Sequence, residues 1–354
     1  MAKTKKKISR QTRSNIITYG IVILACIIVQ TMINSGSISS LMEGLMVPLC
    51  IYAILAVSLN LVVGILGELS LGHAGFMCVG AFASALFSKC MRGEMESDGL
   101  RFFLALLIGV AAAALFGLLI GIPVLRLKGD YLAIVTLAFG EIIKNLVNVL
   151  YIGKDSGGFH ISTQDVMELD ADGTMIISGP QGITGTPRDA TFLIGIILVL
   201  ITLFIVINLT NSRSGRAIMS IRDNRIAAES IGINVTKYKL MAFTVSAALA
   251  GSAGVLYAHN LSTLTATTNN FGYNQSIMIL VFVVLGGIGN IRGSMIAAVI
   301  LTLLPELLRG LSDYRMLIYA IVLIVMMLFN WAPKAIEWRE KYLSFGRKKK
   351  EAVK

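Results

Sequence analysis

The sequence predicts an all-α fold, a polytopic transmembrane helical bundle of about ten spans with both termini cytoplasmic. Hydrophobic residues make up 55% of the 354 residues and charged residues 14%, whereas soluble domains carry about 25% charged residues. The mean hydropathy is +0.77, and the apolar residues lie in runs close to the roughly 20 residues that a helix needs to cross a bilayer. These features exclude a soluble enzyme, a disordered chain, a secreted disulfide scaffold and an outer-membrane barrel, whose strands alternate in polarity.

Eight apolar segments are clear predicted spans, and one longer stretch needs a decision. The eight segments are 16–33, 41–66, 69–87, 102–125, 131–152, 191–209, 239–258 and 316–332. The longer stretch, 275–309, contains the glycine-rich run 286–293, so it is either one long span or two spans joined by a turn. Two spans place most Lys and Arg residues on the cytoplasmic side, as the positive-inside rule requires. We therefore expect ten spans.

The ends of the chain are basic, and the predicted membrane domain lies between them. Residues 1–15 and 333–354 are predicted cytoplasmic tails, and 16–332 is the membrane domain. The formal net charge of +11 is concentrated beside the spans, which is typical of membrane orientation and not of nucleic-acid binding. The first apolar run is too long for a signal-peptide core and no small-residue cleavage site follows it, so we expect an uncleaved first span.

Residues 153–189 form a predicted outer loop that is acidic, polar and too long for a simple connector. Its acidic residues are Asp155, Asp165, Glu168, Asp170, Asp172 and Asp189. Two interpretations remain for this loop. It is either a solvated connection or a docking surface for an external partner.

Residues 210–240 form a predicted cytoplasmic segment of a different kind. Asn211 and Ser212 can cap the start of a helix, the stretch 216–231 has apolar residues at roughly helical spacing, and Gly232 can end it. The apolar positions are Ile218, Ile221, Ile226 and Ile231, and the basic ones are Arg213, Arg216, Arg222 and Arg225. Such an amphipathic helix either lies on anionic lipid or provides a binding site for a cytoplasmic protein.

A glycine-rich run at the start of the third predicted span is a candidate for a solute path. The residues concerned are Gly67, Ser70, Gly72, His73 and Gly75. Glycine at membrane depth is tolerated where the backbone is buried in protein or lines a cavity, and broken helices form solute sites in transporters. The alternative for His73 is a neutral histidine that is hydrogen-bonded within the bundle.

Glu141 and Lys144 lie on the same helix face near the middle of the predicted span 131–152. Charges at that depth are costly and are therefore functional candidates, so Glu141 is added to the predicted solute path. An ion pair between residues three apart would instead make both residues structural. The spacing leaves both interpretations open.

No motif for catalysis or nucleotide binding is present. The sequence has no phosphate-binding Gly-x-x-x-x-Gly-Lys-Ser/Thr loop, no His-Glu-x-x-His motif and no Gly-x-Ser-x-Gly turn. Its four cysteines have no metal or disulfide spacing. We expect no catalytic residue, no metal site and no cofactor bound by this chain, and therefore no enzyme activity of its own.

Several long motifs occur in a fixed order along the membrane domain. They are GELSLGHAGFMCVGAFASAL (67–86), LRLKGDYLAIVTLAFGEIIKNL (125–146), GPQGITGTP (179–187), a segment over 215–258 that begins GRAIMSIRDNRIAAESIGI, VLGGIGNIRGSMIAA (284–298) and LPELLR (304–309). Together they resemble the bacterial branched-chain amino acid ABC permeases of the LivM type, which belong to binding-protein-dependent importers. The resemblance runs over about residues 45–332, essentially the whole membrane region.

The resemblance implies the membrane-spanning subunit of an ATP-driven importer in the bacterial inner membrane. The implied partners are a second related permease, two cytoplasmic ATPase subunits that bind ATP and Mg²⁺, a periplasmic or extracellular amino acid-binding protein, and membrane lipid. The segment 222–232 is similar to the loop by which such permeases engage their ATPases. The implied contact residues are Arg222, Asp223, Ala227, Ala228, Glu229 and Gly232. The alternatives are a permease for urea or amides, a self-sufficient secondary carrier that works through Glu141 and Lys144, and a membrane scaffold or channel.

Overall fold

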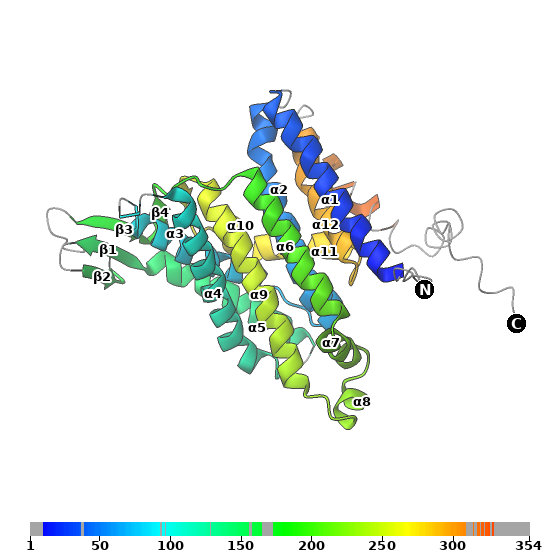
Figure 1. Ribbon diagram of the computed structural model, residues 1–354. Helices are drawn as coiled ribbons and strands as arrows, with labels where there is room; N and C mark the ends of the chain where they lie inside the picture. Colours follow the sequence, from blue (N-terminus) through cyan, green and yellow to red (C-terminus); the bar gives the residue numbers. More distant parts are fainter. Residues whose placement is uncertain are drawn as a thin grey trace, which may run out of the picture.

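The computed structural model shows a helical protein with a small sheet at one side (Figure 1). The described residues are 10–36, 39–92, 94–95, 97–127, 129–155, 158–164, 173–308 and some of those between 314 and 328. Several predicted features lie outside them: residues 1–9 of the first basic tail, the second basic tail, much of the last predicted span, and Asp165, Glu168, Asp170 and Asp172 of the outer loop.

The long helices follow one another in the order of the predicted spans. They are α1 (Arg10–Asn34), α2 (Ser40–Asn60), α3 (His73–Cys90), α4 (Asp98–Val124), α5 (Asp130–Val149), α6 (Phe192–Asn211), α9 (Val235–Asn260), α11 (Tyr273–Gly286) and α12 (Ile291–Leu307). A short π-helix, η1 (Leu61–Leu66), continues α2. The shorter helices are α7 (Arg213–Asp223), α8 (Arg225–Ser230) and α10 (Thr268–Phe271).

Five of the described helical segments are long and apolar enough to cross a membrane. They are Met42–Leu66, Asp98–Val124, Asp130–Val149, Phe192–Asn211 and Val235–Asn260. The apolar part of α1, Thr18–Asn34, is shorter. These lengths indicate a multi-pass helical membrane protein, while the total of ten spans and the cytoplasmic location of both termini stay predictions.

The predicted division of the stretch 275–309 is present as α11 and α12. In the turn between them Gly287 and Gly289 have φ angles of 95° and 82°, a backbone region that glycine adopts without steric cost. Asn60 at the end of α2 holds this turn. Its Oδ1 accepts the N–H of Gly289 at 2.9 Å, and its Nδ2 donates to Ser294 Oγ at 3.0 Å.

The core lies where α9 packs against α3 and α4. A Cβ atom on Gly254 of α9 would lie 2.1 Å from the carbonyl oxygen of Met77, and one on Gly80 would lie 2.5 Å from the Cα of Gly251. The backbones are therefore in direct contact, as small residues allow between membrane helices. The neighbouring α2 packs on α6, α9, α11 and α12, so it links the two sides of the bundle.

The predicted outer loop contains a three-stranded antiparallel sheet, which the all-α prediction did not include. Its strands are β1 (Tyr151–Asp155), β2 (Gly158–Ser162) and β3 (Thr174–Ser178), in the order β2-β1-β3. A 3-10 turn, η2 (Gly179–Gln181), leads to β4 (Ile183–Thr184), which pairs with β5 (Thr263–Leu264). Each strand of the larger sheet has five residues, too few for a clear alternation among so many glycines, so the sequence has the pattern of a loop.

Lys89 at the end of α3 attaches this sheet to the helices. Its Nζ donates to the carbonyl oxygens of Met175 at 2.7 Å and Ile176 at 3.2 Å. Lys154 of β1 donates to Glu94 at 2.8 Å, and this hydrogen bond raises the pKa of Lys154. The sheet is thus tied to the end of α3, and it lies apart from α7 and α8 (Figure 1).

Candidate functional site

The predicted coupling segment forms two short helices at one end of the bundle (Figure 1). The sequence predicts one helix over 216–231, but α7 ends at Asp223 and α8 begins at Arg225. Asn224 between them is extended, with φ −155° and ψ 105°, and its Oδ1 accepts the N–H of Ala227 at 3.0 Å. The single-helix prediction is wrong because Asn224 serves as the N-cap of a second helix.

The four isoleucines of this segment do not share one face. Ile218 and Ile221 of α7 are buried, but Ile226 and Ile231 are 77% and 76% exposed. Ile226 in α8 and Ile231 directly after it are therefore apolar groups that another molecule could cover. The spacing of the sequence groups all four on one amphipathic helix, and for this reason it does not distinguish the exposed Ile226 and Ile231 from the buried pair.

Five of the six predicted contact residues are exposed: Arg222, Asp223, Ala227, Glu229 and Gly232. Ala228 is only 2% exposed and packs with Ile221 and Val235, so it faces the bundle. Arg225 and Glu229 form an ion pair at 3.1 Å on the open side of α8. The segment therefore presents charged and apolar groups together at one end of the molecule.

Arg222 connects α7 to the end of η1. Its Nη1 donates to the carbonyl oxygen of Gly64 at 3.0 Å, and its Nε and Nη2 donate to Asp223 Oδ1 at 3.1 and 2.9 Å. Its side chain lies on Gly67, where an added Cβ would be 2.5 Å from Arg222 Cγ. A residue of the predicted coupling surface thus touches a residue of the predicted solute path.

The chain leaves the helical conformation at Gly67 and returns to it at His73. His73 Nε2 lies 2.7 Å from Ser58 Oγ, and Ser58 precedes the end of η1 by about 12 Å at 1.5 Å per residue. Residues 67–72, the broken segment, therefore turn the chain back along η1, and α3 begins inside the bundle. Ser58 is thus the hydrogen-bond partner within the bundle that the alternative interpretation of His73 requires.

Hydroxyl groups of neighbouring helices satisfy the backbone of the broken segment. Thr136 Oγ1 of α5 accepts the N–H of Leu71 at 3.0 Å, and Ser276 Oγ of α11 accepts the N–H of Ala74 at 3.1 Å. Backbone groups that leave a helix at membrane depth need such partners. The segment is therefore held from both α5 and α11.

The glycines of the run allow close contact with α5. A Cβ on Gly72 would lie 2.0 Å from the carbonyl oxygen of Thr136, and one on Gly75 would lie 2.8 Å from the Cα of Gly140. Ser70 is buried, and its hydroxyl has no hydrogen-bond partner in the part of the chain that the structure describes.

Glu141 and Lys144 form the ion pair that their spacing allows, with 2.5 Å between Glu141 Oε2 and Lys144 Nζ. Glu141 Oε1 accepts the N–H of Tyr273 at 2.8 Å, and Lys144 donates to Thr268 Oγ1 at 3.1 Å. The pair thus joins α5 to α10 and to the first turn of α11. A role of Glu141 in the solute path stays a prediction.

A second ion pair joins Glu68, next to Gly67, to Lys239 of α9. Both side chains are largely shielded from solvent. The sequence places Lys239 only among the basic residues of the cytoplasmic segment, since no local spacing relates it to Glu68. Among the described residues no group of His, Cys, Asp and Glu could hold a metal ion.

Residues 41–329 match the family model described as "Branched-chain amino acid transport system / permease component". The chain belongs to this permease family. The permease is similar to "High-affinity branched-chain amino acid transport system permease protein LivM" of Salmonella typhimurium, with 36% identity over 297 residues, 81% of this chain and 67% of that protein. LivM of Escherichia coli K12 gives the same identity and coverage.

The permease is also similar, at lower identity, to a second permease protein, LivH. The Salmonella typhimurium "High-affinity branched-chain amino acid transport system permease protein LivH" is 24% identical over 256 residues, 71% of this chain and 79% of that protein. No solved structure matches the chain. The permease is therefore a LivM-type transport component with a multi-pass membrane fold, as the sequence motifs predict.

Proposed function

We propose that the permease is the membrane-spanning subunit of an ATP-driven importer that moves branched-chain or similar amino acids into the bacterial cell. It has no enzyme activity in this proposal, because separate cytoplasmic subunits bind ATP and Mg²⁺ and hydrolyse the nucleotide. The observation that carries the proposal is the exposed α7–α8 segment, whose Arg222 bonds to Gly64 and lies on Gly67.

The contact of Arg222 supplies a route for coupling. Two ATPases that close on ATP would displace α7 and α8, and Arg222 would pass that displacement to the end of η1. The broken segment follows directly, and its backbone is bonded to α5 and α11 through Thr136 and Ser276. A shift at Gly67 would therefore change the packing around Ser70 and His73.

The other proposed partners are a second, related permease and an external amino acid-binding protein. The two relatives LivM and LivH carry the name of the same transport system, which supports a pair of related permeases. The outer sheet supports a docking role, because Phe159 and Ile161 on β2 are 59% and 69% exposed. We place the permease in the inner membrane with α7 and α8 on the cytoplasmic side.

Glu229→Arg tests the coupling surface. The substitution reverses an exposed charge on α8 and removes the pair with Arg225, so ATPase subunits should no longer co-purify and amino acid uptake should be abolished, while the permease still folds. Arg126→Glu, another exposed charge reversal at the end of α4, is the matched control. It should keep both the bound ATPase subunits and amino acid uptake. The measurements are uptake in cells and mass spectrometry of the complex purified in mild detergent.

Normal transport by the Glu229→Arg variant with ATPases bound would contradict the assigned surface. A permease that purifies alone and moves solute in liposomes without ATP would contradict the importer itself, and Glu141→Gln would then be the variant to study. Stimulation of ATP hydrolysis by leucine in the purified complex tests the substrate class separately.

A further inference from the structure

The side of α12 that faces α6 carries two separate pockets, which together are called the α12 groove. Both helices pack on α2, which forms the floor, and α1 lies beside them (Figure 1). Two pockets lie in series in the groove. One is at the end near α7, and the other begins one helical turn further along α12, since Ile291 and Arg292 line the first and Met295 and Ile296 the second.

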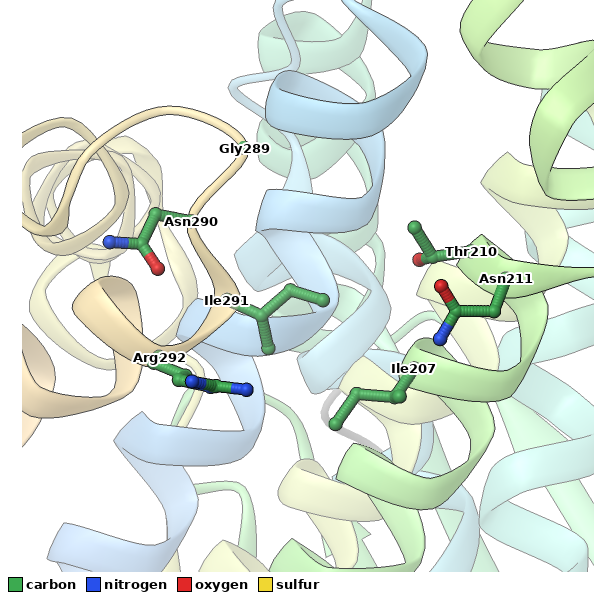
Figure 2. Close-up of a pocket in the computed structure, with 7 residues that line it drawn as sticks. All are labelled: Ile207, Thr210, Asn211, Gly289, Asn290, Ile291 and Arg292. Carbon is green, nitrogen blue, oxygen red and sulfur yellow. The ribbon is translucent and has the colours of Figure 1, made fainter. Parts of the chain in front are cut away.

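The first pocket forms a polar mouth of about 180 Å³. It is lined by Ile207, Thr210 and Asn211 of α6, by Gly289 and Asn290 of the turn, and by Ile291 and Arg292 of α12. Figure 2 shows Ile291 and Arg292 extending toward the side formed by Ile207, Thr210 and Asn211. No acidic side chain in the described ranges pairs with Arg292. Within the described part of the chain, the mouth therefore holds a cation without a counter-charge.

The second pocket is apolar and measures about 240 Å³. Its lining includes Val22 and Cys26 of α1, Cys50 of α2, Ile196 of α6, and Ile296 and Ile300 of α12. The helix rise places Ile300 about 12 Å beyond Arg292. Two of the lining helices, α2 and α6, are long and apolar enough to cross a membrane, and an apolar hydrocarbon chain fills such a pocket without the cost of burying polar groups.

We propose that this groove binds one anionic phospholipid, with its phosphate at Arg292 and an acyl chain between α1, α6 and α12. The occupant is a lipid because an apolar pocket lies one helical turn along α12 from a cationic mouth, and a phospholipid carries the complementary anionic head and apolar tail. Basic pockets between membrane helices on the cytoplasmic side bind such head groups. Arg216 of α7, whose Nη1 donates to the carbonyl oxygen of Asn211 at 3.3 Å, adds positive charge near the same opening.

The test measures the lipid that stays with the purified permease complex. The complex is stripped in detergent, supplied with phosphatidylglycerol or phosphatidylcholine, and analysed by native mass spectrometry. We expect retention of phosphatidylglycerol in preference to phosphatidylcholine. Arg292→Gln should bind phosphatidylglycerol about fivefold more weakly, and Arg292→Lys should recover most of this loss. Arg126→Gln, an exposed arginine at the end of α4, should bind as the wild type does.

A second pair of variants tests the apolar part of the groove. Ala25→Phe fills the space beside Cys26 and should lower lipid retention, whereas Ala111→Phe on the exposed face of α4 should not. Equal retention of the two lipids, or an Arg292→Gln variant that binds as the wild type does, would overturn the proposal. Saturation of the site by glycerol phosphate alone would also overturn the proposal. So would an Ala25→Phe variant that keeps its lipid but no longer binds the second permease.

Discussion

Gly67 is the residue at which backbone conformation and the proposed coupling route meet. Its φ of 81° lies in the left-handed region, and the side chain of Arg222 occupies the space next to it. A side chain at this position would be unfavourable for two separate reasons. The backbone would be strained, and Arg222 would have to move away from Gly64.

Gly67→Ala should therefore reduce uptake, because the added methyl group displaces Arg222. Both effects also lower stability, with roughly 1–2 kcal/mol from the left-handed backbone alone. Gly36→Ala separates the two effects, since Gly36 has a φ of 66° but open space around it. Thermal unfolding should show a loss of stability in both variants. An uptake assay should show a loss of amino acid uptake in Gly67→Ala alone. Equal uptake in the two variants would count against Arg222 as the link.

At the scale of elements, α8 depends on one amide side chain. Its six residues are too few for an isolated helix to be stable in water. The N-cap bond from Asn224 to the N–H of Ala227 and the packing of Ala228 on Ile221 and Val235 hold it in place. The exposed isoleucines therefore rest on a short element with few anchors.

Asn224→Ala should loosen α8 without unfolding the permease. Removal of an N-cap costs about 1 kcal/mol, so amide hydrogens of residues 227–230 should exchange about fivefold faster. Asn234→Ala removes the equivalent cap of α9, where Asn234 Oδ1 accepts the N–H of Lys237 at 3.0 Å, and serves as the control. Exchange in α8 that is unchanged by Asn224→Ala would show that packing alone holds the helix.

On the scale of the whole molecule, the proposed contact surfaces lie far apart in the structure. The sheet β1–β3 projects beyond α3, whereas α7 and α8 extend from another end of the bundle (Figure 1). Phe159 and Ile161 are exposed on the sheet, and they lie on the same face because side chains alternate along a strand. Changes on the sheet should therefore leave the coupling segment intact.

The double substitution Phe159→Ser and Ile161→Ser should raise the concentration of binding protein needed for half-maximal uptake. It removes exposed apolar surface, so the thermal stability should stay close to that of the wild type. Leu193→Ser, at an exposed position at the start of α6, should not change the requirement. If the double variant and the wild type need the same concentration, the sheet is not the docking surface.

The features that follow from local spacing are predictable from the sequence. The division at 286–293 follows from glycine and charge, and the pair of Glu141 with Lys144 follows from helical geometry. Contacts between distant residues do not follow, such as that of Arg222 with Gly64, because no sequence pattern encodes a bond across 158 positions. The strands are missed since five residues among glycines show no period.

The helical coupling segment shows the same limit at smaller scale. Its location, its exposed charges and its end at Gly232 are predictable, because caps and glycine act locally. The break at Asn224 is also local, since it comes from the N-cap of α8, but the spacing of the apolar residues conceals it. The burial of Ala228 depends on tertiary packing against Val235. The predicted path residues are brought together with α5 and α11, but whether they line the path stays a prediction.

The bond from Arg222 to Gly64 has a consequence for where the second long helix ends. Carbonyl groups in the last turn of a helix have no partner further along the chain and need one from elsewhere. Here the partner of Gly64 comes from a residue 158 positions later. The N–H groups of Gly67 and Glu68 cap the carbonyl of Val62 from within the chain, but the carbonyl of Gly64 is capped by another element of the molecule. If α7 moves away, that carbonyl loses this partner, so the order of the last turn of η1 reports the position of the segment outside the membrane.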